Sequence, residues 1–109
     1  MIVNEMAKAL GLTELSAIDG ERECSGVYIG DLLSWVMGRA KTDNVWITIM
    51  SNINIVAVAS LADVACIILA EGVTVDDNVR MTAEAKGINL YTSEKTAYEL
   101  ASMLARLDV

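Results

Sequence analysis

The sequence predicts one α/β domain of three layers, α/β/α, in which helices cover both faces of a mostly parallel sheet. Three observations support this prediction. The chain has 109 residues, the usual length of one domain. After residue 44 it alternates between extended and helical patterns three times. Residues 64–69 are continuously apolar, as strands in the middle of parallel sheets are. We therefore expect residues 1–109 to form a single domain.

Two helices are predicted before the polar turn at residues 41–44. Apolar side chains at helical spacing indicate a short amphipathic helix over residues 2–10, which Gly11 ends in a left-handed conformation. Asp31 is expected to cap a helix over residues 32–40. The inward stripe of this second helix is expected to consist of Leu32, Leu33, Val36 and Met37, with Trp35 to one side. A tryptophan at such a position is more often core than binding surface.

Between these helices lie two short extended segments, residues 13–18 and 25–29. The sequence Asp19-Gly20-Glu21 between them is typical of a turn. Because the two segments are close in sequence and joined by turn chemistry, we expect them to pair with each other at an edge of the sheet.

The centre of the sheet is expected at residues 45–50 and 64–69. Residues 45–50 alternate between two sets of side chains, which indicates a strand covered on both faces. Asn52 or Asn54 could cap a helix that runs to about residue 62, although the β-branched side chains here also fit a strand. We choose the helix because a parallel neighbour needs a crossover of about a dozen residues, and this interval provides it.

The carboxy-terminal part repeats the strand and helix pattern. Thr74, with Asp77 three residues later, resembles a capping box for a helix over residues 75–86 that ends at Gly87. Residues 88–91 form a short predicted strand, and Ser93 is expected to cap the last helix. The stripe of this helix that packs on the sheet consists of Ala97, Leu100, Ala101, Leu104 and Leu107.

Composition and charge exclude several classes of protein. The formal charge is −7, with 15 acidic against 8 basic side chains, so the chain repels a nucleic-acid backbone. The apolar stretch at residues 45–61 is interrupted by polar side chains, and the first ten residues lack the pattern of a secretory signal, so we expect no membrane association and a cytoplasmic location. Cys24 and Cys66 cannot form a metal site in a chain without histidine, and we expect them to be buried, reduced thiols.

Ligands of parallel α/β sheets bind beyond the carboxyl ends of the strands, where helix N-termini can hold a small anion. In the predicted fold, three loops meet there, at residues 51–54, 70–72 and 92–96. The candidate ligand-binding residues are Thr48, Ser51, Asn52, Asn54, Gly72, Thr92, Ser93, Lys95 and Thr96. Nearby acidic residues oppose a bare phosphate unless a metal accompanies it. The alternative is that the polar residues among them are simply helix caps.

Signatures of catalysis are missing from the sequence. It contains neither the glycine-rich phosphate loop that ends in Gly-Lys-Ser/Thr nor the Gly-x-Gly-x-x-Gly dinucleotide fingerprint. Histidine, the usual general base near neutral pH, is absent. We therefore expect no enzymatic activity and no cofactor.

Three strings of residues, GVYIGDLLSWVM, WITIMSNINIVAVASLADVACIILAEG and GINLYTSEKTAYELA, resemble the DRTGG domain family over nearly the whole chain. That domain is similar to the amino-terminal domain of HPr kinase/phosphorylase. It also occurs in some phosphotransacetylases and between paired CBS domains of certain pyrophosphatases. The resemblance implies a regulatory, dimer-forming module without catalytic activity of its own.

The residues that give the family its name are only partly present. In the family an Asp-Arg pair follows the central strand and Thr-Gly-Gly follows the next one. The matching regions of this chain are residues 51–54, Ser-Asn-Ile-Asn, and residues 70–72, Ala-Glu-Gly, so only Gly72 matches. The resemblance therefore implies the fold and the dimer more directly than it implies a ligand.

Two functional hypotheses follow. The first is a homodimeric regulatory or ligand-sensing domain that binds a small metabolite or nucleotide at the three loops. The second is a protein-interaction or accessory subunit of a larger redox or signalling enzyme, without a small ligand. A mean hydropathy of +0.44 is high for a small monomer, which favours a symmetric partner. Trp35, Met37 and Tyr98 are the candidate interface residues.

Overall fold

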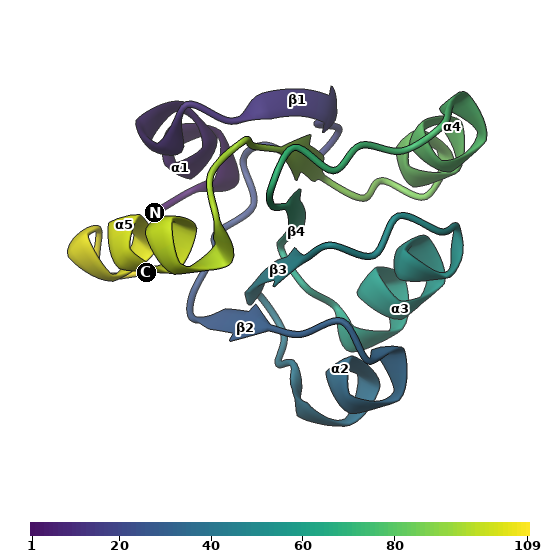
Figure 1. The fold of residues 1–109 in the computed structure, drawn as a ribbon, viewed down its shortest axis with the longest axis horizontal. Coiled ribbons are helices and arrows are strands. Elements are labelled where there is room, and N and C mark those ends of the chain that lie inside the picture. Colours follow the sequence, from purple (N-terminus) through teal and green to yellow (C-terminus); the bar gives the residue numbers. More distant parts are fainter.

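The computed structural model describes all residues from 1 to 109 and contains one five-stranded sheet with the strand order β1-β5-β4-β3-β2 (Figure 1). The four strands β2 to β5 are parallel, and β1 runs antiparallel to β5 at one edge. The strands are β1 (Thr13–Ser16), β2 (Val27–Ile29), β3 (Val45–Thr48), β4 (Cys66–Leu69) and β5 (Leu90–Thr92). The prediction of a mostly parallel sheet is confirmed.

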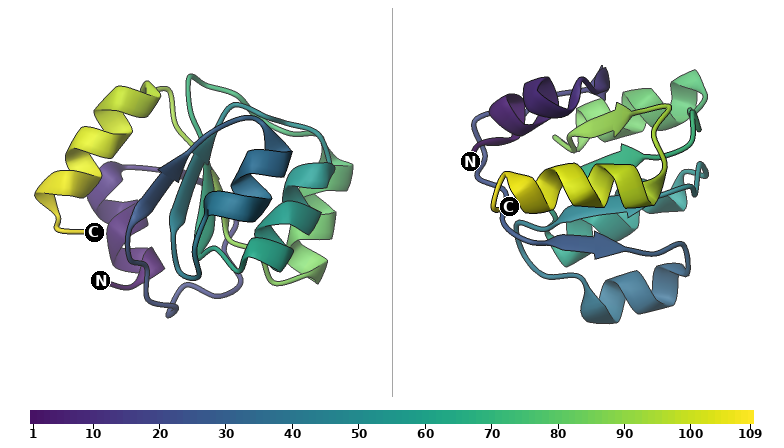
Figure 2. Two further views of the ribbon diagram at one scale, coloured as in Figure 1. Left: turned by 90° about the horizontal axis from the view of Figure 1, so that it is seen from below. Right: turned by 60° about the vertical axis from the view of Figure 1, so that its left-hand side comes forward.

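Helices cover both faces of this sheet. They are α1 (Val3–Leu10), α2 (Leu33–Arg39), α3 (Asn54–Ala62), α4 (Asp77–Ala85) and α5 (Ala97–Arg106). The helices α2, α3 and α4 each connect two adjacent parallel strands, and all three lie on one face of the sheet. The three connections have the same handedness and step in the same direction along the sheet, so they cross the same face. Helices α1 and α5 lie together on the other face (Figure 2). The predicted three-layer α/β/α class is therefore confirmed.

Strand β4 separates two apolar clusters. Its four side chains are fully buried, and they alternate between the faces of the sheet. Cys66 and Ile68 belong to the cluster under α1 and α5, whereas Ile67 and Leu69 belong to the cluster under α2, α3 and α4. A continuously apolar strand thus lies in the middle of the sheet, as the sequence predicted.

The expected pairing of the first two extended segments is wrong. Strand β1 lies beside β5 and strand β2 lies beside β3, so the two are at opposite edges of the sheet. Side chains fix the connection between them. Asn89 bonds both the N–H and the C=O of Asp19, each at 2.9 Å, and Arg22 donates to Asp43 and Asp63 at 2.9 and 3.0 Å. These contacts join residues that are distant in sequence, which local turn chemistry cannot reveal.

The expected caps of α4 and α5 are also wrong. Asp76, not Thr74, caps α4, and its carboxylate accepts the backbone N–H three residues later at 3.1 Å. Thr96, not Ser93, caps α5 through a complete capping box with Glu99. The Thr96 backbone N–H and hydroxyl lower the pKa of Glu99 below its usual range. This stabilising effect is present above the ordinary carboxyl pKa and is lost as the pH falls through the lowered value.

Helices α2 and α3 begin without a side-chain cap, contrary to expectation. Their N-cap residues are Leu32 and Ile53. Asp31, the expected cap of α2, bonds instead to the end of β3. The Asn52 side chain accepts the backbone N–H of Asn54 at 2.8 Å, which closes a turn just before α3 rather than capping it.

The expectation that Trp35 is core is wrong, because 52% of its surface is exposed. Of the stripe predicted for α2, Val36 alone is fully buried, and Leu32 and Met37 are 58% and 41% exposed. The reason is the position of α2, which follows the edge strand β2 and has α3 as its helical neighbour on one side only (Figure 1). The guanidinium of Arg39 lies 3.7 Å from the centre of the Trp35 indole.

The two cysteines are buried, free thiols, as predicted. Cys66 is completely enclosed, and burial raises the pKa of both thiols. No helix in the structure has the length and apolar composition needed to span a bilayer.

The two candidate caps of α4 can be distinguished by stability. Asp76→Ala should lower the free energy of unfolding by about 1 kcal/mol, because a helix N–H loses its partner. Thr74→Ala should change it by less than about 0.5 kcal/mol, because the exposed Thr74 side chain makes no hydrogen bond. Urea unfolding of both variants measures the difference. Equal losses would contradict the assignment of Asp76 as the cap.

Candidate functional site

The carboxyl ends of the four parallel strands meet at one edge of the sheet, and the helices α3, α4 and α5 begin from the loops there (Figure 1). We call residues 48–54, 70–72 and 92–96 the rim. The rim is where the sequence places a ligand, and the structure brings its three loops side by side because β3, β4 and β5 are adjacent.

Thr48, at the end of β3, is held by a carboxylate from the neighbouring strand's loop. Its hydroxyl donates to Asp31 at 2.8 Å, and the same carboxylate oxygen accepts the Ile49 N–H at 2.9 Å. The Thr48 hydroxyl also accepts the Met50 N–H at 3.2 Å. The Thr48 hydroxyl is therefore already hydrogen-bonded, and its bonds fix the path of the chain after β3.

The loops after β4 and β5 form one hydrogen-bonded unit. The N–H of Glu71 donates to the carbonyl of Lys95 at 2.9 Å, and the N–H of Gly72 donates to the carbonyl of Ser93 at 2.8 Å. The Ser93 hydroxyl accepts the Lys95 N–H at 3.1 Å, and the Thr92 hydroxyl donates to the carbonyl of Val73. Two of these four bonds join main-chain groups alone, and a side-chain hydroxyl takes part in each of the other two.

Gly72, the residue that matches the family pattern, occupies a position that favours glycine. Its φ of +74° is in the left-handed region that favours glycine. A Cβ atom at this position would lie 2.6 Å from a carboxylate oxygen of Glu94. The positive φ is the main reason for glycine here, since the Glu94 side chain could move aside.

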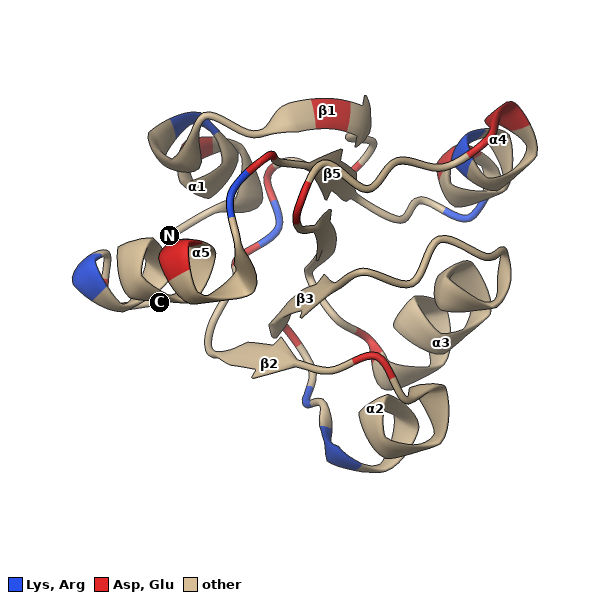
Figure 3. Cartoon of the chain, viewed as in Figure 1, with Lys and Arg blue, Asp and Glu red and all other residues tan.

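Four of the nine predicted ligand-binding residues keep polar side-chain groups that bond nothing in the protein. These groups are the Ser51 hydroxyl, the NH₂ of Asn52, the amide of Asn54 and the ammonium of Lys95. The backbone N–H groups of residues 51–53 also donate to no acceptor. What the rim offers to a ligand is therefore mostly hydrogen-bond donors, with Glu71 and Glu94 as opposing negative charges (Figure 3).

The hollows of the surface lie beside the rim rather than on it. Lys95 lines a hollow of about 280 Å³ along the outside of α5, together with Tyr98, Glu99, Ser102, Met103 and Arg106. The largest hollow, of about 430 Å³, lies between α1 and β1. No sequence motif indicated this larger hollow, because the residues around it come from three separate elements.

The structure does not bring the three predicted interface residues together. Trp35 and Met37 lie on α2, whereas Tyr98, which is 81% exposed, lies on α5 across the sheet (Figure 2). Near Trp35, the exposed apolar side chains on α2 and at its start are Leu32 and Met37. The adjacent α3 has no charged side chain (Figure 3). We call Leu32, Trp35 and Met37 the apolar patch.

Comparison with known proteins identifies a family and a solved structure of similar fold. The model of the DRTGG domain matches residues 5–107. The regulatory region of the Clostridium perfringens pyrophosphatase, crystallised as its CBS and DRTGG domains with the activator diadenosine tetraphosphate, has a TM-score of 0.73 and 12% sequence identity to this chain. The similarity covers 94% of this chain and 45% of that one, and at this identity it shows a shared fold. No curated protein sequence matches the chain.

Gly72 provides a test of the rim geometry. Gly72→Ala should lower the free energy of unfolding by about 1–2 kcal/mol, since an alanine is strained at positive φ and its methyl group would displace Glu94. Gly38→Ala is the control, because Gly38 is helical and a Cβ there meets open space. That variant should instead gain about 0.5–1 kcal/mol. Thermal unfolding of both proteins checks the opposite signs, and a Gly72→Ala protein as stable as the wild type would refute the assigned geometry.

Proposed function

Because this chain belongs to the DRTGG domain family, we propose that it is a non-catalytic regulatory domain that forms a homodimer and binds a small metabolite or nucleotide at the rim. The observation that supports this most is the fold it shares with the regulatory region of a pyrophosphatase, where a DRTGG domain occurs together with an activator nucleotide. The proposed dimer and the proposed ligand both rest on membership of this family.

The chemistry of the rim favours binding over catalysis. The carboxylate of Asp31 already accepts two hydrogen bonds, and that of Glu99 is committed to the capping box. The chain contains no histidine that could exchange protons near pH 7. The rim groups without partners are the Ser51 hydroxyl, side-chain amides, the Lys95 ammonium and two glutamate carboxylates, and no base is bonded to the Ser51 hydroxyl to activate it.

These donors also limit the kind of ligand. Unpaired N–H groups before α3 and the Lys95 ammonium suit acceptor oxygens such as those of a carboxylate, a sugar or a phosphate ester. Glu71 and Glu94 oppose a highly charged anion. We therefore favour a weakly anionic metabolite, or a nucleotide whose phosphates are neutralised by magnesium.

A screen of nucleotides and central metabolites, with and without magnesium, should reveal a compound that raises the melting temperature. The double variant Asn52→Ala and Asn54→Ala should lose this response, because it removes the unpaired NH₂ of Asn52 and the unpaired amide of Asn54 from the rim. It should also lose about 1 kcal/mol of stability, the usual value for one local turn or cap bond. Asn78→Ala, an exposed asparagine on α4, is the matched control and should respond as the wild type does. If no compound stabilises the wild type, the accessory-subunit hypothesis becomes the better one.

The apolar patch supports the homodimer. Its side chains are 41–58% exposed in the isolated chain, and they lie at the start of α2 and on it, beside the β2 edge of the sheet. Aromatic residues, methionine and arginine are enriched at interface cores, which also suits the Arg39 guanidinium that lies over the Trp35 ring. A two-fold axis near this edge would cover the patch with the same patch of a second copy.

Sedimentation at micromolar concentration should therefore show a dimer. The double variant Trp35→Ser and Met37→Ser should sediment as a monomer, because it removes two large apolar side chains from the surface of α2. Met81→Ser, which removes a 58% exposed methionine from α4, is the control and should remain dimeric. Tyr98→Ser measures separately whether α5 contributes. A wild type that sediments as a monomer would contradict the homodimer.

A further inference from the structure

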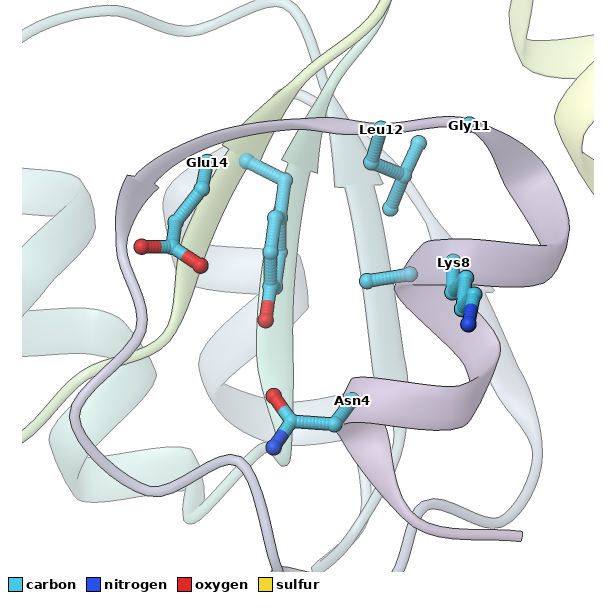
Figure 4. Close-up of a pocket in the computed structure, with 7 residues that line it drawn as sticks. Asn4, Lys8, Gly11, Leu12 and Glu14 are labelled. Carbon is cyan, nitrogen blue, oxygen red and sulfur yellow. The ribbon is translucent and has the colours of Figure 1, made fainter.

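The largest hollow of the molecule lies away from the rim, between helix α1 and strand β1 (Figure 4). Its volume is about 430 Å³, within the range of small-molecule sites. It is lined by Asn4, Ala7, Lys8, Gly11, Leu12, Glu14 and Tyr91. The hollow is formed because α1 packs beside α5 over one face of the sheet while β1 extends that sheet beyond β5.

The wall of this hollow contains a buried donor without an acceptor. Tyr91 is only 2% exposed, and its hydroxyl has no hydrogen-bond partner in the protein. Burial raises the pKa of Tyr91 to about 12, so at neutral pH the group is an intact O–H. It is the one buried side-chain polar atom of the chain left without a partner. Such a group is destabilising unless something else bonds it.

Three further polar side chains around the hollow are also unpaired. Asn4 and Lys8 are one helical turn apart on α1, and Glu14 lies directly across the β1–β5 ladder from Tyr91. None of their side chains makes a hydrogen bond or an ion pair within the protein. In Figure 4 Glu14 and Lys8 stand on opposite sides of the hollow, with Asn4 on a third side.

We propose that this hollow binds a small zwitterion of the amino-acid type. Lys8 would hold its carboxylate and Glu14 would hold its ammonium group. The Tyr91 hydroxyl, which is enclosed in the ligand-free chain, would donate to the carboxylate once the side chains around it move apart. One positive and one negative side chain, placed on opposite sides, match a ligand that has both charges and no net charge. Ala7 and Leu12 supply apolar surface for the side chain of such a ligand. The site is separate from the rim, and it does not depend on whether the rim is occupied.

The test is a titration of the ¹⁵N-labelled full chain with each of the twenty common amino acids, followed by NMR. At least one of them should move the backbone amide signals of Lys8, Gly11 and Glu14 in a saturable way. The N-acetylated form, which lacks the ammonium, and the corresponding amine, which lacks the carboxylate, should each bind more weakly. The double variant of Asn52 and Asn54 should bind like the wild type, because those residues belong to the rim.

Tyr91→Phe removes the hydroxyl and keeps the ring. It should weaken binding by about tenfold, the effect of losing one hydrogen bond to a charged group. Tyr98→Phe, on the exposed face of α5, is the matched control and should have no effect. Without ligand, Tyr91→Phe should melt at or above the wild-type temperature, because the lost hydroxyl had no internal partner.

Three results would overturn the proposal. One is the absence of saturable shifts around the hollow with any amino acid. Another is equal affinity of Tyr91→Phe and the wild type, which would place the binding elsewhere. The third is a clear fall in the melting temperature of ligand-free Tyr91→Phe, which would show that the hydroxyl is already bonded inside the protein.

Discussion

The burial of strand β4 is the constraint on which the rest of this structure depends. Its four residues expose no surface, and their side chains alternate between two separate apolar clusters. Such a strand is stable only if both of its edges are paired and both of its faces are covered. The parallel neighbours β3 and β5 meet the first need, and the two helical layers meet the second. A shift of the β4 register by one residue would exchange the two clusters, so the same strand also fixes the alignment of the sheet.

Both ends of the sheet are fixed by bonds between segments that are distant in sequence. At the amino end, Asn89 bonds Asp19 and Ala65, and Arg22 bridges Asp43 and Asp63. At the carboxyl end, backbone bonds join the loops after β4 and β5, and side chains hold the end of β3. Substitutions of rim residues whose side chains make no bond are therefore expected to be tolerated better than substitutions of Asn89 or Arg22.

Sequence reasoning succeeded where a single local pattern determined the structure. The amphipathic helix that ends at Gly11, the apolar strand β4 and the crossover helices all follow from periodicity or length. It failed where several residues competed for one role, as Asp76 and Thr74 did for the cap of α4. It also failed where the outcome depended on partners distant in sequence. The separation of β1 from β2 and the exposure of Trp35 depend on which strands form the edges of the assembled sheet. The Tyr91 hydroxyl is left without a partner because of the way α1 packs beside β1.

The two ends of the chain lie next to each other, on the side of the molecule where α1 meets α5 (Figures 1 and 2). A host protein could therefore leave its own fold and re-enter it at almost the same point, with this domain as an insert in one surface loop. Such an insertion adds little to the cost of closing that loop, because the separation of the joined ends hardly changes. The same proximity means that a movement of α1 against α5 would be transmitted directly to both attachment points.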